Sequence, residues 1–526
     1  MDKASEMGKV SATGSFHLFM GKTISTVIMA IGTIILGNLM LEEEYGLYAV
    51  ALIPPLMINL FQDWGINSAM TKYIAQNRAT NQEENIHDII TAGLIFKTTT
   101  GLTLSLTSLL LANYIATTIF NRPETTTLIA IASLTILSDS LLTASQSNFN
   151  GFEKMGLNSL TLITQSIIKT TASTLLVLFG YGALGAVLGY TFSTLTAGAI
   201  GLIMLYFLIF RKLLRKHNPH QPNTIKALKK MLCFGVPLSI STILSGFLTQ
   251  FYAFMMAFYC TDIMIGNYQI AANFAVLLTF FTFPIATVLF PAFSKLDPKS
   301  EPQLLQTVFT SSTKYTAMLL VPATMAIMVL SEPMVSTLFG QKWIHAPFFL
   351  TIYAITNLFV VFGRFILGSL LTGIGETKML LKITLLTLSL GIPVAFILIP
   401  ALGIVGVILG TLIAGIPSLF WGLHWIWKHY KAKADYKSSA KIFAASTLAA
   451  LITYMFLSFV NTAEWIQLVI GGTIFLTAYI FTAPTIGAVT QTDIKNLKTM
   501  LSGLGIISKL INIPLTIAEK FTSTKT

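Results

Sequence analysis

Apolar runs of about 20 residues or more recur along nearly the whole chain, and they constrain the fold more than any other feature. Only 10% of the residues are charged, whereas a typical soluble domain has about 25%. Because lipid offers no hydrogen-bonding partner to the backbone, each spanning segment is expected to be a helix. The sequence therefore predicts an all-α polytopic membrane protein without β-sheet.

The apolar runs predict about fourteen transmembrane helices. The candidate spans are 16–40, 45–70, 86–114, 125–149, 156–180, 183–210, 231–258, 263–293, 304–331, 346–372, 378–400, 402–428, 438–460 and 464–488. An even number of spans puts both termini on the same side of the membrane. Pro54 and Pro55 predict a kink in the second helix, because proline removes a backbone donor.

The loops that carry lysine and arginine lie almost entirely on the side of the termini. The opposite loops carry Arg122 and Lys342 only. This asymmetry predicts a plasma-membrane protein with cytoplasmic N- and C-termini. The net charge of +12 is then explained by topology and by contact with anionic membrane lipids, so we expect no nucleic-acid partner.

The second and eighth predicted helices begin with related sequences. Gly46 and Gly266, and likewise Tyr48 and Tyr268, are separated by 220 residues. Two further pairs of segments follow in the same order: 151–155 resembles 375–379, and 182–189 resembles 403–410. Glycine-rich helix-packing patterns can recur by chance, but three collinear matches favour an internal duplication.

The duplication predicts two six-helix pseudo-symmetric bundles plus two C-terminal helices. The expected divisions are an N-terminal bundle at 1–210, a basic cytoplasmic linker at 211–230, a C-terminal bundle at 231–430, two additional transmembrane helices at 431–488 and a cytoplasmic interfacial tail at 489–526. Halves with an even number of helices insert in the same orientation, so an axis along the membrane normal relates them and the substrate is handled between them.

The first hairpin, with Glu44-Tyr45-Gly46-Leu47-Tyr48, resembles the opening motif of a known transporter family. The segment 375–379 and its continuation to 399–406 resemble the same family, the polysaccharide flippases of the multidrug/oligosaccharidyl-lipid/polysaccharide superfamily, of the O-antigen exporter type with archaeal members. The resemblance implies twelve core helices in two bundles, a central cavity and export of a polyprenyl-linked glycan. One departure is the uncharged stretch 234–258, where family members often carry charge.

Ionisable side chains within spans are costly and usually line an aqueous path. The candidate substrate-binding cations are Lys22, Lys97, Lys169, Lys314 and Arg364. Asp63 and Asp139 are either salt-bridge partners or sites of ion or proton coupling. The excess of cations favours a cavity that binds phosphate. Alternatively, Lys22 and Arg364 extend to the near membrane surface.

The resulting functional prediction is a flippase that moves a polyprenyl-(di)phosphate-linked oligosaccharide from the inner to the outer leaflet by alternating access, as a monomer. The alternative is a cation-coupled multidrug exporter of the same superfamily, whose cavity should carry acidic residues. We find no metal-ligand, cofactor or nucleophile–base pattern, and the outer loops are short. We therefore expect no enzymatic activity, no cofactor and no metal site.

Overall fold

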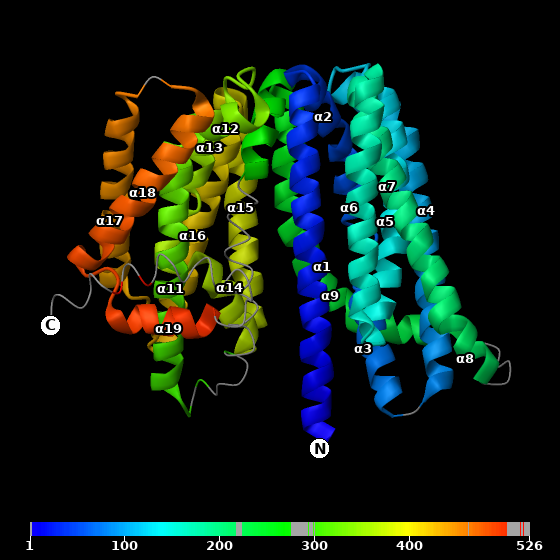
Figure 1. Ribbon diagram of the computed structural model, residues 1–526. Coiled ribbons are helices and arrows are strands. Elements are labelled where there is room, and N and C mark those ends of the chain that lie inside the picture. Colours follow the sequence, from blue (N-terminus) through cyan, green and yellow to red (C-terminus); the bar gives the residue numbers. More distant parts are fainter. Residues whose placement is uncertain are drawn as a thin grey trace. The chain divides into compact units, whose positions relative to one another are not determined.

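The structure is a computed structural model that describes residues 3–80, 82–216, 223–274, 300–460 and 462–501, with residues 293, 298, 516 and 519. All regular elements of these residues are helices, which confirms the predicted all-α class (Figure 1). Within the described residues, ten helices, or eleven if one bent pair counts as a single span, are long and apolar enough to cross a membrane. This number is compatible with fourteen spans, because α6 and α7 are counted together and the eighth predicted span lies partly outside the described residues.

The chain divides into two compact units, Met1–Gly266 and Asn267–Thr526. The first unit contains α1 (Lys3–Leu39), α2 (Glu42–Asn59), α3 (Ile66–Ala79), α4 (Glu83–Tyr114), α5 (Thr125–Gly151), α6 (Met155–Leu176), α7 (Gly182–Leu205), α8 (Arg211–Lys216) and α9 (Thr224–Tyr259). Short π-helical turns follow three of these helices, at Ile115–Ile119, Val177–Tyr181 and Tyr206–Phe210. Helix α6 packs against α1 and α7, and α5 packs against α4 and α7. Residues 217–222 of the predicted linker lie outside the described residues.

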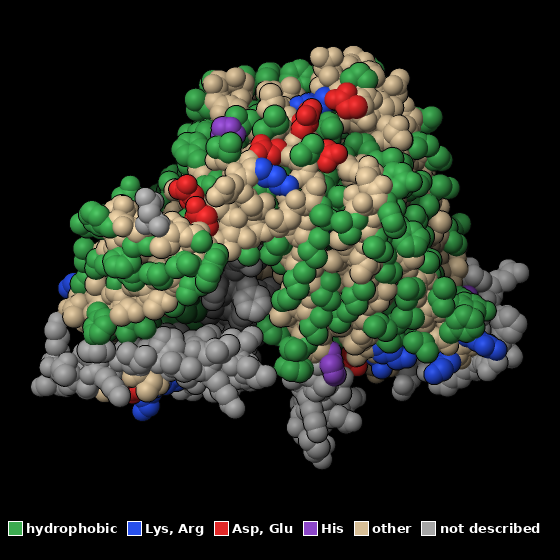
Figure 2. Space-filling model, turned by 45° about the horizontal axis from the view of Figure 1, so that its top comes forward, with side chains coloured by type: hydrophobic (Ala, Val, Ile, Leu, Met, Phe, Trp, Pro, Cys, Tyr) green, Lys and Arg blue, Asp and Glu red, His purple; other side chains and the backbone are tan. Residues whose placement is uncertain are grey.

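The two ends of the first unit differ in charge. The end that we call the basic end holds Lys72, Arg78, Lys154, Lys212 and Lys230. The opposite end holds the α1–α2 turn, with Glu42, Glu43 and Glu44 in the first turn of α2. Figure 2 shows acidic side chains gathered on this opposite end, and Lys and Arg side chains along the lower border of the same unit.

The second predicted span, 45–70, is not one continuous helix. Helix α2 passes through Pro54 and Pro55 and ends at Asn59, and α3 begins at Ile66. Between them Gly65 adopts a left-handed conformation with φ of 76°, which a helix cannot contain. The Asp63 side chain accepts a hydrogen bond from the Asn67 N–H at 3.1 Å and so satisfies a donor of the first turn of α3. The interruption therefore leaves backbone N–H and C=O groups without intrahelical hydrogen bonds in the middle of a span.

Close backbone approach fixes where this interrupted span meets its neighbours. A Cβ atom on Gly46 would lie 1.9 Å from the carbonyl oxygen of Asp262, and one on Gly266 would lie 2.3 Å from the carbonyl oxygen of Glu42. The two glycines that the repeat pairs thus allow the starts of α2 and of the helical segment at 262–274 to touch. At the interruption, a Cβ atom on Gly65 would lie 2.2 Å from the Gly235 carbonyl of α9.

The second unit is also helical. It contains α11 (Pro302–Val329), α12 (Ser331–Phe339), α13 (Ala346–Ile355), α14 (Arg364–Gly373), α15 (Thr377–Leu402), α16 (Ile404–Tyr430), α17 (Tyr436–Leu457), α18 (Glu464–Ile486) and α19 (Gln491–Leu501). Helix α17 packs against α11 and α18, and α15 packs against α16. Within this unit α19 runs across the long helices rather than along them (Figure 1). Most of the predicted tail beyond α19 lies outside the described residues.

The tenth predicted span, 346–372, is interrupted as well. Helices α13 and α14 bend by 49°, with a 3₁₀ turn at Leu358–Phe362 between them. Gly363 has φ of 88° and stands directly before Arg364. The predicted span is thus helical but broken, because a residue with positive φ ends the hydrogen-bond ladder.

Candidate functional site

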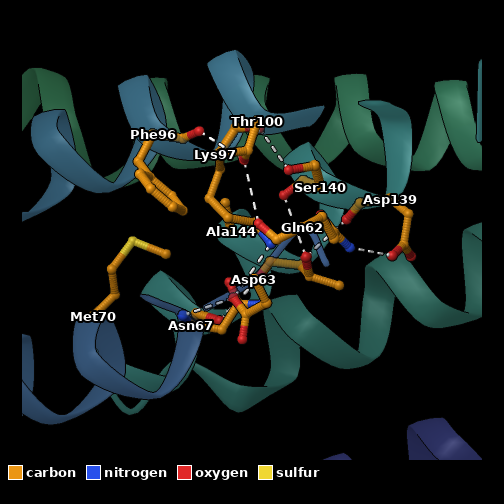
Figure 3. A network of polar contacts seen from close by, with 12 residues as sticks. Gln62, Asp63, Asn67, Met70, Phe96, Lys97, Thr100, Asp139, Ser140 and Ala144 are labelled. Carbon is orange, nitrogen blue, oxygen red and sulfur yellow. Dashed lines mark hydrogen bonds and ion pairs between the residues drawn. The ribbon is translucent and has the colours of Figure 1, made fainter. Parts of the chain in front are cut away.

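The interruption at residues 60–65 faces the middle of α4 and α5 and forms a polar network with them (Figure 3). The ammonium nitrogen of Lys97 lies 3.4 Å from Oδ1 of Asp63 and donates to Oε1 of Gln62 at 3.0 Å. Thr100, one turn further along α4, donates to the backbone carbonyl of Gln62 at 3.2 Å. The interruption thus supplies two acceptors for a lysine that would otherwise be buried without partners.

Asp139 joins the same network from α5. Its Oδ2 accepts hydrogen bonds from the amides of Asn59 at 3.0 Å and Gln62 at 2.9 Å. The Gln62 amide therefore bridges Lys97 and Asp139, with its oxygen toward the cation and its nitrogen toward the anion. Ser140, the next residue of α5, donates to the Lys97 carbonyl at 2.6 Å and ties α5 to α4. The three elements hold two carboxylates and one ammonium group together.

The exposure of these side chains shows which charge is accessible. The Lys97 side chain is 0% exposed, and that of Asp63 is 35% exposed. Gln62 is buried, and Asp139 is half-buried. Asp63 is thus the accessible member of this ion pair, and the Nζ–Oδ1 separation of 3.4 Å is longer than a strong charge-assisted hydrogen bond of about 2.8 Å.

Lys169 lies on α6 and points toward α7. Its nitrogen is 4.7 Å from the centre of the Tyr190 ring, which is a cation–π contact. Lys97 and Lys169, predicted as two cavity cations, thus lie in the same unit, one on α4 and the other on α6.

The other predicted cations lie elsewhere. Lys22 is exposed on α1. Lys314 of α11 forms an ion pair of 2.7 Å with Asp493 of α19, with the two side chains 17% and 7% exposed. Arg364 is exposed at the start of α14 and donates from Nη1 to the Thr356 carbonyl at 2.8 Å. Within each unit, then, the predicted cations do not all converge on one point.

The amides that organise the network were not among the site residues predicted from the sequence. Asn59 and Gln62 hold Asp139, and Gln62 also holds Lys97. A signal for them existed, because Asn59, Gln62 and Asp63 stand within five positions in an otherwise apolar span. Such a cluster indicates backbone that is not in a regular helix, since polar side chains near a break satisfy its free groups. Among the described residues, no group of three or more His, Cys, Asp or Glu is placed to hold a metal ion.

Chemically, the network offers acceptors and donors in the middle of an apolar bundle. Buried ionisable groups of this kind are retained in membrane proteins mainly where they line a path for polar solutes or hold helices in register. The interruption also divides the second span into two helical segments, α2 and α3. These features suit a transporter.

Comparisons with known proteins agree with the fold. The solved structure of the lipid II flippase MurJ in an inward closed conformation matches with a TM-score of 0.71, covering 89% of this chain and 98% of that chain at 17% identity. Among curated relatives, the probable low-salt glycan biosynthesis flippase Agl15 of Haloferax volcanii is 24% identical over 47% of this chain and 53% of its own length. The chain thus spans about half the length of that relative.

The lipopolysaccharide biosynthesis protein WzxC of Escherichia coli is 25% identical over 74% of this chain and 76% of its own length. These likenesses, with the number of apolar helices, identify a multi-pass membrane protein. The model of the family described as polysaccharide biosynthesis protein matches residues 11–297, which is more than half of the chain. The chain therefore belongs to the polysaccharide biosynthesis protein family.

Proposed function

We propose that this protein is a flippase that moves a lipid-linked oligosaccharide from the inner to the outer leaflet of the plasma membrane. The observation that carries the proposal is the family membership together with a charged network at an interrupted span in the first unit. Relatives named as flippases support the same activity. We expect transport without covalent chemistry, by a monomer.

The proposed orientation puts the basic end and both termini in the cytoplasm. The support is the positive-inside rule, because Lys72, Arg78, Lys154, Lys212 and Lys230 lie at one end of the first unit. The opposite end, with Glu42, Glu43 and Glu44, then faces outward. A lipid-linked glycan assembled in the cytoplasm would meet the basic end first.

The proposed working parts are two matched bundles, 1–210 and 231–430, joined by 211–230. The helices at 431–488 and the tail at 489–526 are accessory to them. The pairing of Gly46 with Gly266 supports the matched bundles, because each glycine permits the close approach that the other repeat unit needs. Alternating access would come from rocking of the bundles.

The proposed substrate contacts are the cations Lys22, Lys97, Lys169, Lys314 and Arg364. Lysine presents a compact positive charge to phosphate, whereas the planar guanidinium of arginine donates two parallel hydrogen bonds to it. For Lys97, the diphosphate would replace Asp63 as the partner of the ammonium group, while Gln62 keeps the lysine in place. Movement of the anionic head group outward is favoured by an inside-negative potential, by about 2.3 kcal/mol per charge per 100 mV.

The test is translocation of a fluorescent lipid-linked oligosaccharide by purified protein in proteoliposomes with an imposed potential. We expect Lys169→Gln to lower the initial rate at least tenfold. Lys212→Gln, at the exposed basic end, is the matched control and should transport normally. A Lys169→Gln variant that transports at the normal rate would remove this lysine from the path, and a wild type that moves no lipid-linked glycan would overturn the function.

A further inference from the structure

Two exposed lysines of the first unit are held against a pair of aromatic rings at the basic end. The ring centres of Tyr73 and Phe234 are 5.8 Å apart, and the rings meet edge to face at 67°. The Lys72 nitrogen lies 3.8 Å from the centre of Phe234 and 5.4 Å from that of Tyr73. The Lys230 nitrogen lies 4.4 Å from the centre of Tyr73. One ring therefore has two ammonium groups beside it.

These four residues come from two elements that are firmly joined. Lys72 and Tyr73 belong to α3, and Lys230 and Phe234 belong to α9. The close approach of Gly65 and Gly235 brings the two helices together just beyond the aromatic pair. Tyr73 and Phe234 are half-buried and pack on the core cluster that includes Ile74 and Met231. The core thus positions the two rings, and the two ammonium groups lie beside them.

The charge of this pair is not balanced by any carboxylate among the residues that the structure describes. In the described part of the chain, neither Lys72 nor Lys230 forms an ion pair with a carboxylate. Both side chains are exposed. The cation–π contacts orient the lysines but leave two like charges close together. An anion between them would offset their repulsion.

We propose that Lys72, Tyr73, Lys230 and Phe234 form a capture site for a phosphate group carried by a lipid. Both nitrogens lie within 5.4 Å of the Tyr73 centre, so they are at most about 10 Å apart. A diphosphate can bridge them, since each ammonium group donates to a phosphate oxygen at about 2.8 Å. The aromatic pair, continuous with the apolar core, offers a surface for the first carbons of the lipid.

The capture site deepens the proposed function and rests on it for its biological meaning. Helix α3 begins at Ile66, directly after the interruption, and reaches Lys72 six residues later. At 1.5 Å per residue this is roughly 9 Å along the helix axis. The capture site thus lies beyond the interruption along α3, on the side from which the substrate would arrive. It would hold the phosphate before the head group reaches the interrupted span.

Cys233 provides a reporter beside the site. It is a free, exposed thiol adjacent to Phe234 and one turn from Lys230, and Cys260 is buried. The experiment uses the full chain in nanodiscs of neutral lipid, with Cys260→Ala so that Cys233 is the single thiol. The rate of Cys233 alkylation is measured with and without farnesyl diphosphate. We expect farnesyl diphosphate to slow alkylation at least threefold in a saturable manner.

The variants separate the site from general charge. Lys72→Gln with Lys230→Gln should abolish the protection, and Lys229→Gln, an exposed neighbour on α9, should keep it. Each variant is compared with itself in the absence of ligand, because removing Lys230 also changes the reactivity of the thiol. Loss of protection in the Lys229→Gln control, or full protection in the double variant, would overturn the proposal.

Two further ligands distinguish the source of the phosphate. Protection by inorganic pyrophosphate at the same concentration supports phosphate recognition without a contribution from the lipid chain. Protection by phosphatidylglycerol alone, with no further effect of farnesyl diphosphate, would show a general anionic-lipid contact and overturn the site. Translocation is measured separately. No protection with normal translocation refutes the capture site only, and protection without any translocation refutes the proposed function only.

Discussion

Arg122 and Asp262 form a buried ion pair between residues that lie far apart in the sequence. The Arg122 Nε atom is 2.8 Å from Oδ1 and 3.0 Å from Oδ2 of Asp262, with the side chains 11% and 15% exposed. The guanidinium also donates to the backbone carbonyls of Ala257 and Cys260 at the end of α9. One arginine in the α4–α5 loop thus fixes the end of α9 and the start of the helical segment at 262–274.

Arg122→Gln should destabilise the protein by about 3–5 kcal/mol, because it leaves the buried Asp262 carboxylate without its partner. The measurement is the midpoint of thermal unfolding in detergent. The control is Arg78→Gln, since the Arg78–Glu153 pair is 3.4 Å long and its side chains are 38% and 45% exposed. Such a surface pair contributes about 0–1 kcal/mol. Equal losses in the two variants would contradict the special role of Arg122.

Gly46→Ala should disrupt the contact between α2 and the segment that begins at Asp262. The added Cβ atom would lie 1.9 Å from a backbone carbonyl, which cannot move independently of its helix. Overpacking of this kind costs about 1–3 kcal/mol or more. Gly472→Ala is the control, because nothing lies within 4 Å of its added Cβ atom and alanine favours helix. Comparable unfolding midpoints for the two variants would refute the packing argument.

The lengths and ends of most helices could be predicted from the sequence. Predicted spans 86–114, 378–400 and 464–488 correspond to α4, α15 and α18 within a few residues. The reason is that bilayer thickness sets the length of an apolar run, and the run is directly visible. The same logic predicted Arg122 as a loop cation that marks topology, but the structure buries it against Asp262. The two residues are 140 positions apart in the sequence, and no local sequence pattern indicates that they form a pair.

The interruptions and the site geometry were harder to predict. Gly65 and Gly363 look like other glycines in apolar helices, and their positive φ appears only in the fold. Lys97 was predicted as a site residue because a charged side chain within a membrane span is energetically costly. Its pairing with Asp63 and Gln62, however, depends on how α4 packs against the interruption. Helical periodicity predicts which face of a helix a residue lies on, but it does not predict which residue of another helix contacts that face.

The thiol of Cys260 should react slowly, and its rate should rise with pH. Burial raises the pKa of Cys260 to about 11, and nearby Arg122 opposes that shift. Because the thiolate is the nucleophile, about one thiol in a thousand is reactive at pH 8. Alkylation of a Cys233→Ser variant is expected to accelerate about tenfold per pH unit between pH 8 and pH 10. A rate independent of pH would contradict the shifted pKa.

Lys97→Met should destabilise the first unit, because Asp63 loses the ammonium group 3.4 Å away and the Gln62 carbonyl loses its donor. The Asp63 side chain is 35% exposed, so we expect a loss of about 1–3 kcal/mol, as for a hydrogen-bond acceptor left without its partner. Adding Asp63→Asn removes the Asp63 carboxylate and should restore part of the unfolding midpoint. The amide oxygen that this second substitution introduces can still accept from the Asn67 N–H, so the start of α3 is preserved. Additive losses in the double variant would show that the two residues are not coupled.

Asp493→Ala should release α19 from α11 within the second unit. The Asp493 carboxylate pairs with Lys314 at 2.7 Å and accepts from the backbone N–H and the hydroxyl of Thr490 at 2.9 and 2.6 Å. The substitution removes a largely buried ion pair and the return hydrogen bond from the Thr490 N–H, which is one half of the capping box at the start of α19. We expect amide hydrogen exchange of the peptide 491–501 to accelerate at least tenfold.

The matched control for α19 is Gln491→Ala, because Gln491 is exposed at the first position of the same helix. Its exchange rates should match those of the wild type. Asn496→Ala provides an intermediate case, since it removes one hydrogen bond of 2.9 Å to the hydroxyl of Tyr315. If exchange in 491–501 is unchanged by Asp493→Ala, the ion pair does not hold α19, and Lys314 is free to contact a substrate phosphate without displacing the tail.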